Sequence, residues 1–102
     1  IASAIECPQP LDGKKALQSL LESKGFAEDV SDKAILRARD LLARKEGIFA
    51  EPGGAVSLAG LLKAREKIER GSKVICLVTG HGLKDPYRQP ITHKGFKYKM
   101  GK

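Results

Sequence analysis

The sequence predicts an α/β protein in which helices and short strands alternate along a single domain of 102 residues. Apolar side chains recur at helical spacing in residues 14–24 and again in residues 32–46. Residues 74–78 read Val-Ile-Cys-Leu-Val without alternation, which is typical of a strand covered on both faces. Short apolar pieces at 26–30 and 48–50 complete the alternating order, and that order predicts a layered α/β arrangement.

The segment at 32–46 carries the clearest start and stop signals of a helix. Ser31 stands where an N-cap residue is expected, and Asp32 places a carboxylate in the first turn. Gly47 follows the last turn, where glycine commonly ends a helix. The apolar stripe of this helix consists of Ala34, Ile35, Ala38, Leu41 and Leu42. We expect the basic residues to occupy its other face and its C-terminal end: Arg37, Arg39, Arg44 and Lys45.

A third helix is predicted at 55–63, which is apolar on nearly all sides. Only Ser57 and Gly60 interrupt it before Lys63, so we expect it to be buried on most sides. A body of about 80 residues has difficulty in supplying partners for such a helix and for a doubly covered strand. The first residue is also Ile1 rather than Met. We therefore expect the chain to be a piece of a longer protein with a larger core.

The net charge of +7 is concentrated at the C-terminal end. Residues 84–102 carry a net charge of +5, which divides the chain into a body at 1–86 and a basic irregular tail at 87–102. In the tail, lysines alternate with Phe96 and Tyr98, which could bind phosphates and stack on bases. A solvated terminus explains the same residues, and a balanced body gives little support to nucleic-acid binding.

The cysteines and histidines suggest neither a disulfide framework nor a metal site. Cys7 and Cys76 lack zinc-ligand spacing and are expected to be reduced thiols in the cytoplasm. His81 and His93 lack a third ligand at suitable spacing. Cys76 lies in the apolar run and is expected to be buried and inert, which argues against a nucleophile–base pair with His81. We find no pattern of a signal peptide or membrane span and expect no membrane partner.

The main candidate site is the loop that follows the strand predicted at 74–78. Its residues, Thr-Gly-His-Gly, begin with Thr79, whose hydroxyl would lie at the strand end where ligands collect in open α/β sheets. Gly80 would let the backbone approach an anion or a flat ring. The alternative is an ordinary turn with a capping threonine. Glu51 is the second candidate, because a carboxylate is favoured at a helix start, although that role can be purely structural.

Two stretches resemble the C-terminal part of threonine synthases. Residues 46–63 read Glu-Gly-Ile-Phe-Ala-Glu-Pro-Gly-Gly-Ala-Val-Ser-Leu-Ala-Gly-Leu-Leu-Lys, and residues 77–86 read Leu-Val-Thr-Gly-His-Gly-Leu-Lys-Asp-Pro. The resemblance covers about residues 1–86, although Gly53 and Gly54 replace the Ala-Ser pair common in that family. It implies a three-layer αβα architecture, part of the tryptophan-synthase-β-like fold of pyridoxal-phosphate enzymes.

The resemblance also implies a reaction, the conversion of O-phospho-L-homoserine and water to L-threonine and phosphate. In that family, the residue matching Thr79 donates its hydroxyl to the pyridine nitrogen of the cofactor. Gly80 and Gly82 would let the loop pass close to the ring, and Glu51 would lie near the cofactor side. The family's Schiff-base lysine, in a Ser-Phe-Lys context, is absent here, so we assign no catalytic residue and expect the chain to be inactive alone.

The expected partner is the remainder of a threonine synthase chain or a homologous subunit, with pyridoxal phosphate bound only when that part is present. Exposed apolar surface is expected to cause self-association. Two alternatives stay open. The chain could be a truncated homologue that acts as a binding or regulatory subunit through a sheet edge. It could also be a nucleic-acid-binding module that uses residues 88–102.

Overall fold

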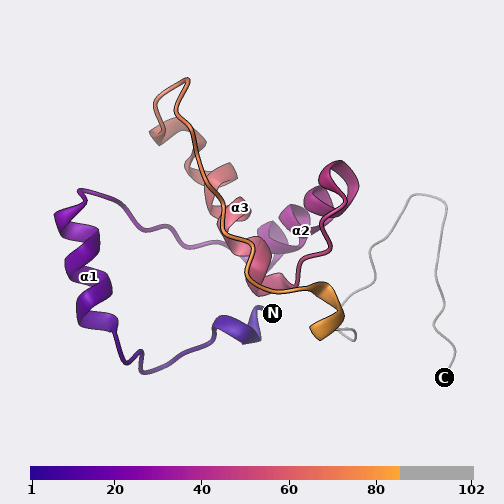
Figure 1. Ribbon diagram of the computed structural model, residues 1–102, viewed down its shortest axis with the longest axis horizontal. Helices are drawn as coiled ribbons and strands as arrows, with labels where there is room; N and C mark the ends of the chain where they lie inside the picture. Colours follow the sequence, from indigo (N-terminus) through magenta and orange to yellow (C-terminus); the bar gives the residue numbers. More distant parts are fainter. Residues whose placement is uncertain (86–102) are drawn as a thin grey trace, which may run out of the picture.

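The computed structural model describes residues 1–85, in which the regular elements are helices (Figure 1). The basic tail predicted at 87–102 lies outside the described residues. Among the described residues, one isolated antiparallel bridge pairs Ala50 with His81. The α-helices are α1 (Gly13–Glu22), α2 (Asp32–Glu46) and α3 (Pro52–Ala64), and the 3₁₀ helices are η1 (Ser3–Ile5), η2 (Arg65–Lys67) and η3 (Gly82–Lys84).

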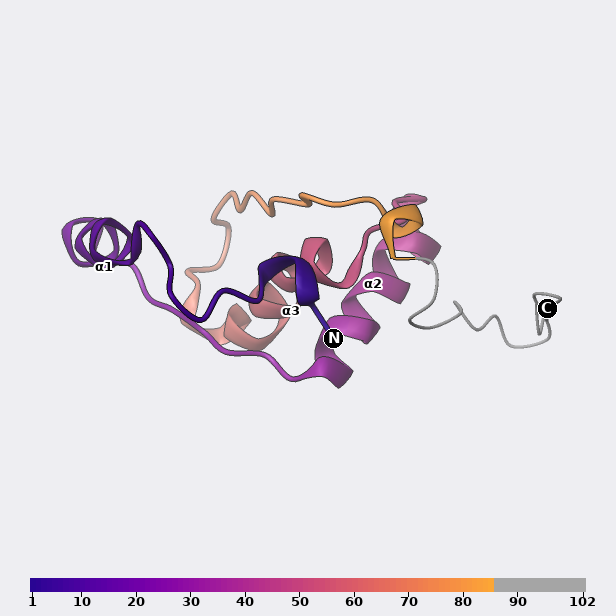
Figure 2. The ribbon, with the colours of Figure 1, turned by 90° about the horizontal axis from the view of Figure 1, so that it is seen from below.

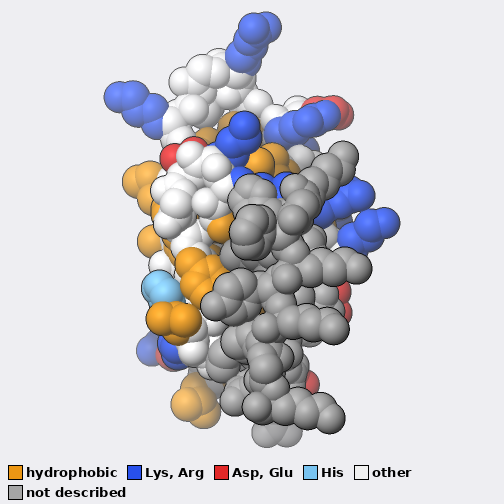
Figure 3. All heavy atoms as spheres, turned by 90° about the vertical axis from the view of Figure 1, so that its right-hand side faces the viewer, with side chains coloured by type: hydrophobic (Ala, Val, Ile, Leu, Met, Phe, Trp, Pro, Cys, Tyr) orange, Lys and Arg blue, Asp and Glu red, His pale blue; other side chains and the backbone are white. Residues whose placement is uncertain are grey.

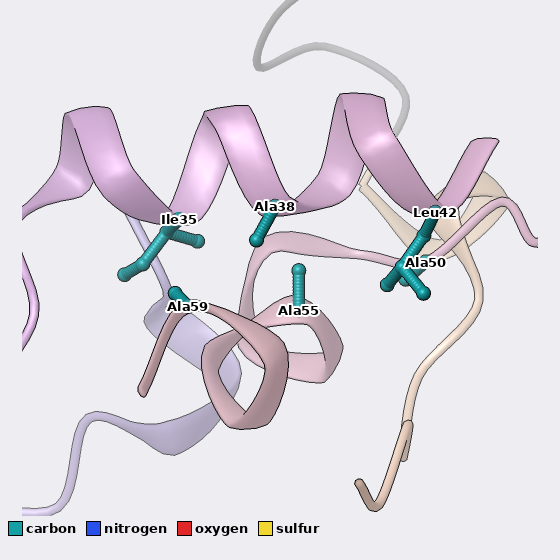
Figure 4. Packing of buried hydrophobic residues seen from close by; sticks show 6 residues of the cluster. All are labelled: Ile35, Ala38, Leu42, Ala50, Ala55 and Ala59. Atoms are coloured by element: carbon teal, nitrogen blue, oxygen red, sulfur yellow. The ribbon is translucent and has the colours of Figure 1, made fainter. Parts of the chain in front are cut away.

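Helices α2 and α3 pack against each other and form the core. The predicted caps of α2 are confirmed: the Ser31 hydroxyl accepts a hydrogen bond from the Ala34 amide at 3.3 Å, and Gly47 ends the helix with φ of 68°. Small side chains at the contact let the two helices approach closely. The core cluster consists of Ile35, Ala38 and Leu42 from α2, Ala55 and Ala59 from α3, and Ala50 (Figure 4).

Arg39 corrects the expectation that all basic residues of α2 face outward. Its side chain is buried, with 5% of the residue exposed, and its guanidinium lies 3.7 Å from the carboxylate of Asp40. Arg39 follows Ala38 of the core directly, about 100° further around the helix. At the margin of the buried face, a long side chain can bury its apolar stem.

Helix α3 starts earlier than the sequence predicts. It begins at Pro52, because proline is favourable in the first turn, where its missing N–H needs no partner. Of the residues predicted at 55–63, Leu62 and Lys63 are exposed, and the others are buried or half-buried. Within the described residues, α2, η1 and residues 74–80 each cover a part of α3, so the expected burial on most sides is confirmed there.

The segments predicted as strands, 26–30, 48–50 and 74–78, form no ladder within residues 1–85. Residues 74–78 run alongside α3, where the Ser57 hydroxyl donates a 2.7 Å hydrogen bond to the Leu77 carbonyl (Figure 2). A strand needs a second strand for its N–H and C=O groups, and the described residues supply none. The strand predictions fail here for that reason, and the three-layer αβα arrangement stays a prediction.

Helix α1 forms where predicted but packs against nothing in the described part of the chain. Its apolar face remains open, with Leu17 59% and Leu21 70% exposed. Figures 1 and 2 both show α1 standing apart from the pair α2 and α3. Helical spacing thus predicted the element correctly, while its burial depends on a partner that residues 1–85 do not contain.

The chain is more open than a self-contained domain of its size. Its radius of gyration is 15.6 Å, whereas a compact chain of this length has about 12–13 Å. Its accessible surface is 8912 Å², against about 5600 Å² for a compact 11 kDa monomer. Figure 3 shows hydrophobic side chains at the surface around the one histidine among residues 1–85. No helix in the described range is long and apolar enough to cross a membrane.

Ion pairs hold residues 26–30 against the C-terminal end of α3. Lys67 pairs with Glu28, and Lys63 pairs with Asp29 at 2.6 Å and with Glu28 at 3.2 Å. Hydrogen bonds from Lys67 and then Lys63 hold the pKa of Glu28 below its ordinary value. The hydrogen bond from Lys63 lowers the pKa of Asp29, and the same pair raises the pKa of Lys63. These contacts give the extended segment a fixed position without a sheet.

Candidate functional site

The candidate site forms where residues 49–51 meet residues 80–82. The Glu51 amide donates to the Gly80 carbonyl at 2.9 Å, and the Gly82 amide donates to the Phe49 carbonyl at 2.8 Å. These hydrogen bonds flank the bridge between Ala50 and His81, as expected for a short antiparallel pairing. The pairing fixes the Thr-Gly-His-Gly loop to the segment that leads into α3.

Thr79 lies at the entrance of this loop and is exposed. It borders an open concavity of about 500 Å³, together with Phe49, Gly80 and His81. Within the described residues, the Thr79 hydroxyl forms no hydrogen bond with another group. The hydroxyl is therefore available as a donor or an acceptor to a molecule that occupies the concavity.

Glu51 is buried beside Gly80. Its side chain is 8% exposed, and a Cβ atom at position 80 would lie 1.8 Å from Glu51 Oε1. Gly80 does not have a positive φ, so close approach, rather than backbone conformation, explains the glycine. The N-terminal end of α3 favours the carboxylate, and Lys84 Nζ lies 4.0 Å from Oε2.

Thr79 and Glu51 border different concavities. Glu51 lines a second one of about 290 Å³, whose wall also includes Pro52, Gly53 and Lys84. Gly80 lies between them, because it borders the first concavity and touches the Glu51 carboxylate. The structure thus brings Glu51 against Gly80 without placing both candidate side chains in one concavity. A role in cofactor binding stays a prediction for Thr79, Gly80 and Glu51.

Phe49, to which no sequence pattern assigns a role, lies beneath Gly82. A Cβ atom at position 82 would lie 2.6 Å from the Phe49 ring. The same ring meets the His81 imidazole edge-on, with centroids 5.6 Å apart and an angle of 85° between the planes. The signal that the sequence offers is the glycine at position 82, where the absent side chain leaves space for the Phe49 ring rather than for a ligand.

Cys76 is half-buried rather than fully buried, which corrects the expectation from the apolar run. It lines a groove between α3 and residues 74–76, and no hydrogen bond joins it to His81 within the described range. Among residues 1–85, no three His, Cys, Asp or Glu side chains are grouped so that they could hold a metal ion. The described geometry therefore offers a hydroxyl donor beside a concavity, with no nucleophile–base pair.

Comparisons with known proteins agree on one family. The model of a family described as pyridoxal-phosphate dependent enzyme matches residues 1–80. The chain is 51% identical to a threonine synthase of Methanocaldococcus jannaschii over 88 residues, which are 84% of this chain and 22% of that protein. It is 48% identical to the Halalkalibacterium halodurans threonine synthase, covering 84% of this chain and 25% of that protein. The chain thus spans about a quarter of the length of these curated relatives.

Proposed function

We propose the following function for this chain, which belongs to the pyridoxal-phosphate dependent enzyme family. In this proposal, the chain supplies one wall of the cofactor site of a threonine synthase, which converts O-phospho-L-homoserine and water to L-threonine and phosphate. The similarity to curated threonine synthases supports this choice of reaction. The observation that carries the proposal is that Thr79 borders a concavity and that its hydroxyl has no hydrogen-bond partner among residues 1–85.

The residues present fit a wall that faces a flat heteroaromatic ring. Thr79 offers a neutral hydroxyl donor, and Gly80 adds no side chain to the wall beside it. When bound, pyridoxal phosphate supplies an electron sink for the substrate. A threonine hydroxyl keeps its proton when it donates a hydrogen bond to a ring nitrogen, so Thr79 would leave that nitrogen unprotonated. With an unprotonated nitrogen, the ring would withdraw electrons less strongly than a ring whose nitrogen is protonated.

Glu51 supports the same wall from behind. Its amide holds the Gly80 carbonyl, and its carboxylate fills the space beside the Gly80 α-carbon. Glu51 borders the smaller concavity rather than the one beside Thr79. We therefore propose that Glu51 positions the loop rather than contacting the pyridine nitrogen.

The remaining part of the site would come from the rest of a threonine synthase chain or from a homologous subunit. We propose that residues 74–78 become a strand of a sheet in that assembly, within the three-layer αβα architecture. The exposure of Ile75 (88%) and Leu77 (72%) supports this, because a strand covered on both faces would bury them. Location in the cytoplasm remains an expectation from the use of cysteine.

Fragment complementation tests the proposal. The chain is co-expressed with the part of the M. jannaschii threonine synthase that it does not match, and phosphate release and retained cofactor absorbance are measured. We expect neither signal from this chain alone and both from the pair. In the pair, Thr79→Val should lower kcat/KM by about 10- to 100-fold through loss of one buried hydrogen bond. Thr79→Ser keeps the hydroxyl and is the matched control.

Two results would contradict this function. Phosphate release by the chain alone would show that it needs no partner. Full activity of the Thr79→Val pair would show that the hydroxyl does not face the reacting system.

A second candidate, a binding or regulatory subunit, uses the same exposed residues 74–78. It predicts co-purification with a complete pyridoxal-phosphate enzyme in preference to a complementary fragment. The nucleic-acid alternative rests on residues 88–102, which lie outside the described range. It predicts affinity that falls steeply with salt and disappears when the tail is deleted.

A further inference from the structure

His81 occupies an unusual position for a histidine, because it caps the short helix η3. Its Nδ1 atom accepts a hydrogen bond from the Leu83 amide at 3.1 Å. Helix caps of this kind are normally formed by Ser, Thr, Asp or Asn. Since Nδ1 is the acceptor, it carries no hydrogen, and the remaining hydrogen of the neutral ring is on Nε2. The contact therefore requires one tautomer of the imidazole.

A second contact fixes the plane of the same ring. The His81 imidazole meets the Phe49 ring edge-on, and Phe49 in turn fills the space beside the Gly82 α-carbon. Edge-to-face pairs of this kind add to stability beyond the area that they bury. One hydrogen bond and one ring contact thus hold a side chain that is otherwise exposed.

The loop needs such support because two of its four residues are glycines. Gly80 and Gly82 lack the Cβ atoms that restrict the backbone elsewhere, so each adds conformational freedom. Backbone hydrogen bonds to residues 49–51 fix the loop on one side. The His81 contact with Leu83 fixes the turn on the other side, immediately after the bridge at position 81.

We propose that His81 is a positioning residue that orients the Thr79 hydroxyl by capping η3 through Nδ1. The proposal rests on the proposed function of Thr79 and extends it to a residue that acts through the conformation of the loop. His81 and Thr79 border the same concavity, so a change in the conformation of residue 81 alters the wall that contains the hydroxyl.

Three variants separate the two nitrogen atoms of the ring. His81→Asn places an amide oxygen close to the position of Nδ1, where asparagine forms caps. His81→Gln places its oxygen closer to the position of Nε2, and His81→Ala removes both. Hydrogen exchange of the Leu83 amide is measured in the full chain, without cofactor or complementary fragment. The amides of α2 serve as the internal control, and kcat/KM is measured in the complemented pair.

We expect the Leu83 amide to exchange about 2- to 30-fold faster in the Ala and Gln variants, the range for loss of a helix cap. The Asn variant should keep wild-type exchange, the α2 amides should not change, and kcat/KM should follow the same order. An Asn variant as impaired as the Ala variant would overturn the proposal, as would equal exchange in all variants. Retained catalysis in Gln but not in Asn would assign the role to Nε2 instead.

Faster exchange throughout α2 in the Ala variant would also overturn a local positioning role. The exchange readout needs no cofactor, so it separates the failure of this inference from the failure of the proposed function. If Leu83 exchange follows the expected order while the complemented pair is inactive, the cap is supported and the proposed function fails.

Discussion

Replacing Gly80 with alanine would place a methyl group where the Glu51 carboxylate lies. The new Cβ atom would be 1.8 Å from Glu51 Oε1 and 2.1 Å from Cδ, far inside any allowed contact. Gly80 does not have a positive φ, so alanine would introduce no backbone strain of its own. The whole cost therefore arises from moving one buried carboxylate or the loop beside it.

The magnitude follows from two opposing terms. Overpacking of a tight site costs about 1–3 kcal/mol. Replacing glycine by alanine where the backbone allows it stabilises by about 0.4–1 kcal/mol, because the unfolded chain loses freedom. We therefore expect a net loss of about 1–2 kcal/mol in the local stability of the pairing between residues 49–51 and 80–82. Glu51→Ala removes the carboxylate that the new methyl group would meet. In that background, Gly80→Ala should not lower the local stability of the pairing.

Hydrogen exchange of the Glu51 amide measures this loss directly, because that amide donates to the Gly80 carbonyl. We expect exchange about 5- to 30-fold faster in Gly80→Ala, and less than about twofold faster when the substitution is added to Glu51→Ala. Gly60→Ala is the matched control, since a Cβ atom at position 60 meets nothing within 4 Å. A full penalty for Gly80→Ala in the Glu51→Ala background would refute the steric explanation, and so would an effect no larger than that of Gly60→Ala.

Three further predictions concern other contacts of the chain. Ser31→Ala should destabilise α2 by about 1 kcal/mol, measured by exchange of its amides, because it removes the N-cap; Ser31→Asp, which keeps an acceptor, should restore it. Gly82→Ala should cost about 1–3 kcal/mol through its clash with Phe49, and the additional substitution Phe49→Ala should remove that clash. The pKa values of Glu28 and Asp29 are lowered in the folded chain from 4.5 and 3.8. Their ion pairs should therefore stabilise the fold at a pH above 4.5 and 3.8, and this stabilisation should be lost as the pH falls through the lower pKa values of the folded chain. An NMR titration that shows unshifted carboxyl groups would contradict this.

Local signals in the sequence determined the helices well. The caps of α2 were predictable because Ser31 and Gly47 act within one helical turn of their own positions. Residues 74–78 were predicted as a strand from the same kind of local pattern, but a strand exists only when a second one pairs with it. The apolar composition of residues 74–78 therefore indicates that this segment needs to be buried. Its pairing as a strand depends on residues that the described range does not contain.

The candidate site shows a different limit of sequence reasoning. Thr79 was selected because it follows an apolar run, and it does lie beside a concavity. Glycines 80 and 82 were explained by the approach of a ligand, whereas the structure fills the space beside them with Glu51 and Phe49. These residues are about thirty positions apart in the chain, so no spacing rule connects them. The capping contact of His81 could likewise not be predicted from the sequence, because histidine rarely caps a helix.

In our proposal, one physical cause explains both the exposed apolar segment and the Thr79 hydroxyl, which lacks a hydrogen-bond partner within residues 1–85. Ile75 and Leu77 face solvent because residues 1–85 provide no layer that covers this side of the segment, and Thr79 directly continues that segment. In a sheet covered by helices, neighbouring strands would pair with the backbone of residues 74–78, the helices would bury the apolar side chains, and the wall at the carboxyl end would be completed. The contacts of Gly80 with Glu51 already fix the loop before that step. Association would thus meet a loop whose backbone is already fixed next to Thr79, and it would cost less conformational entropy than an association that must also order a free loop.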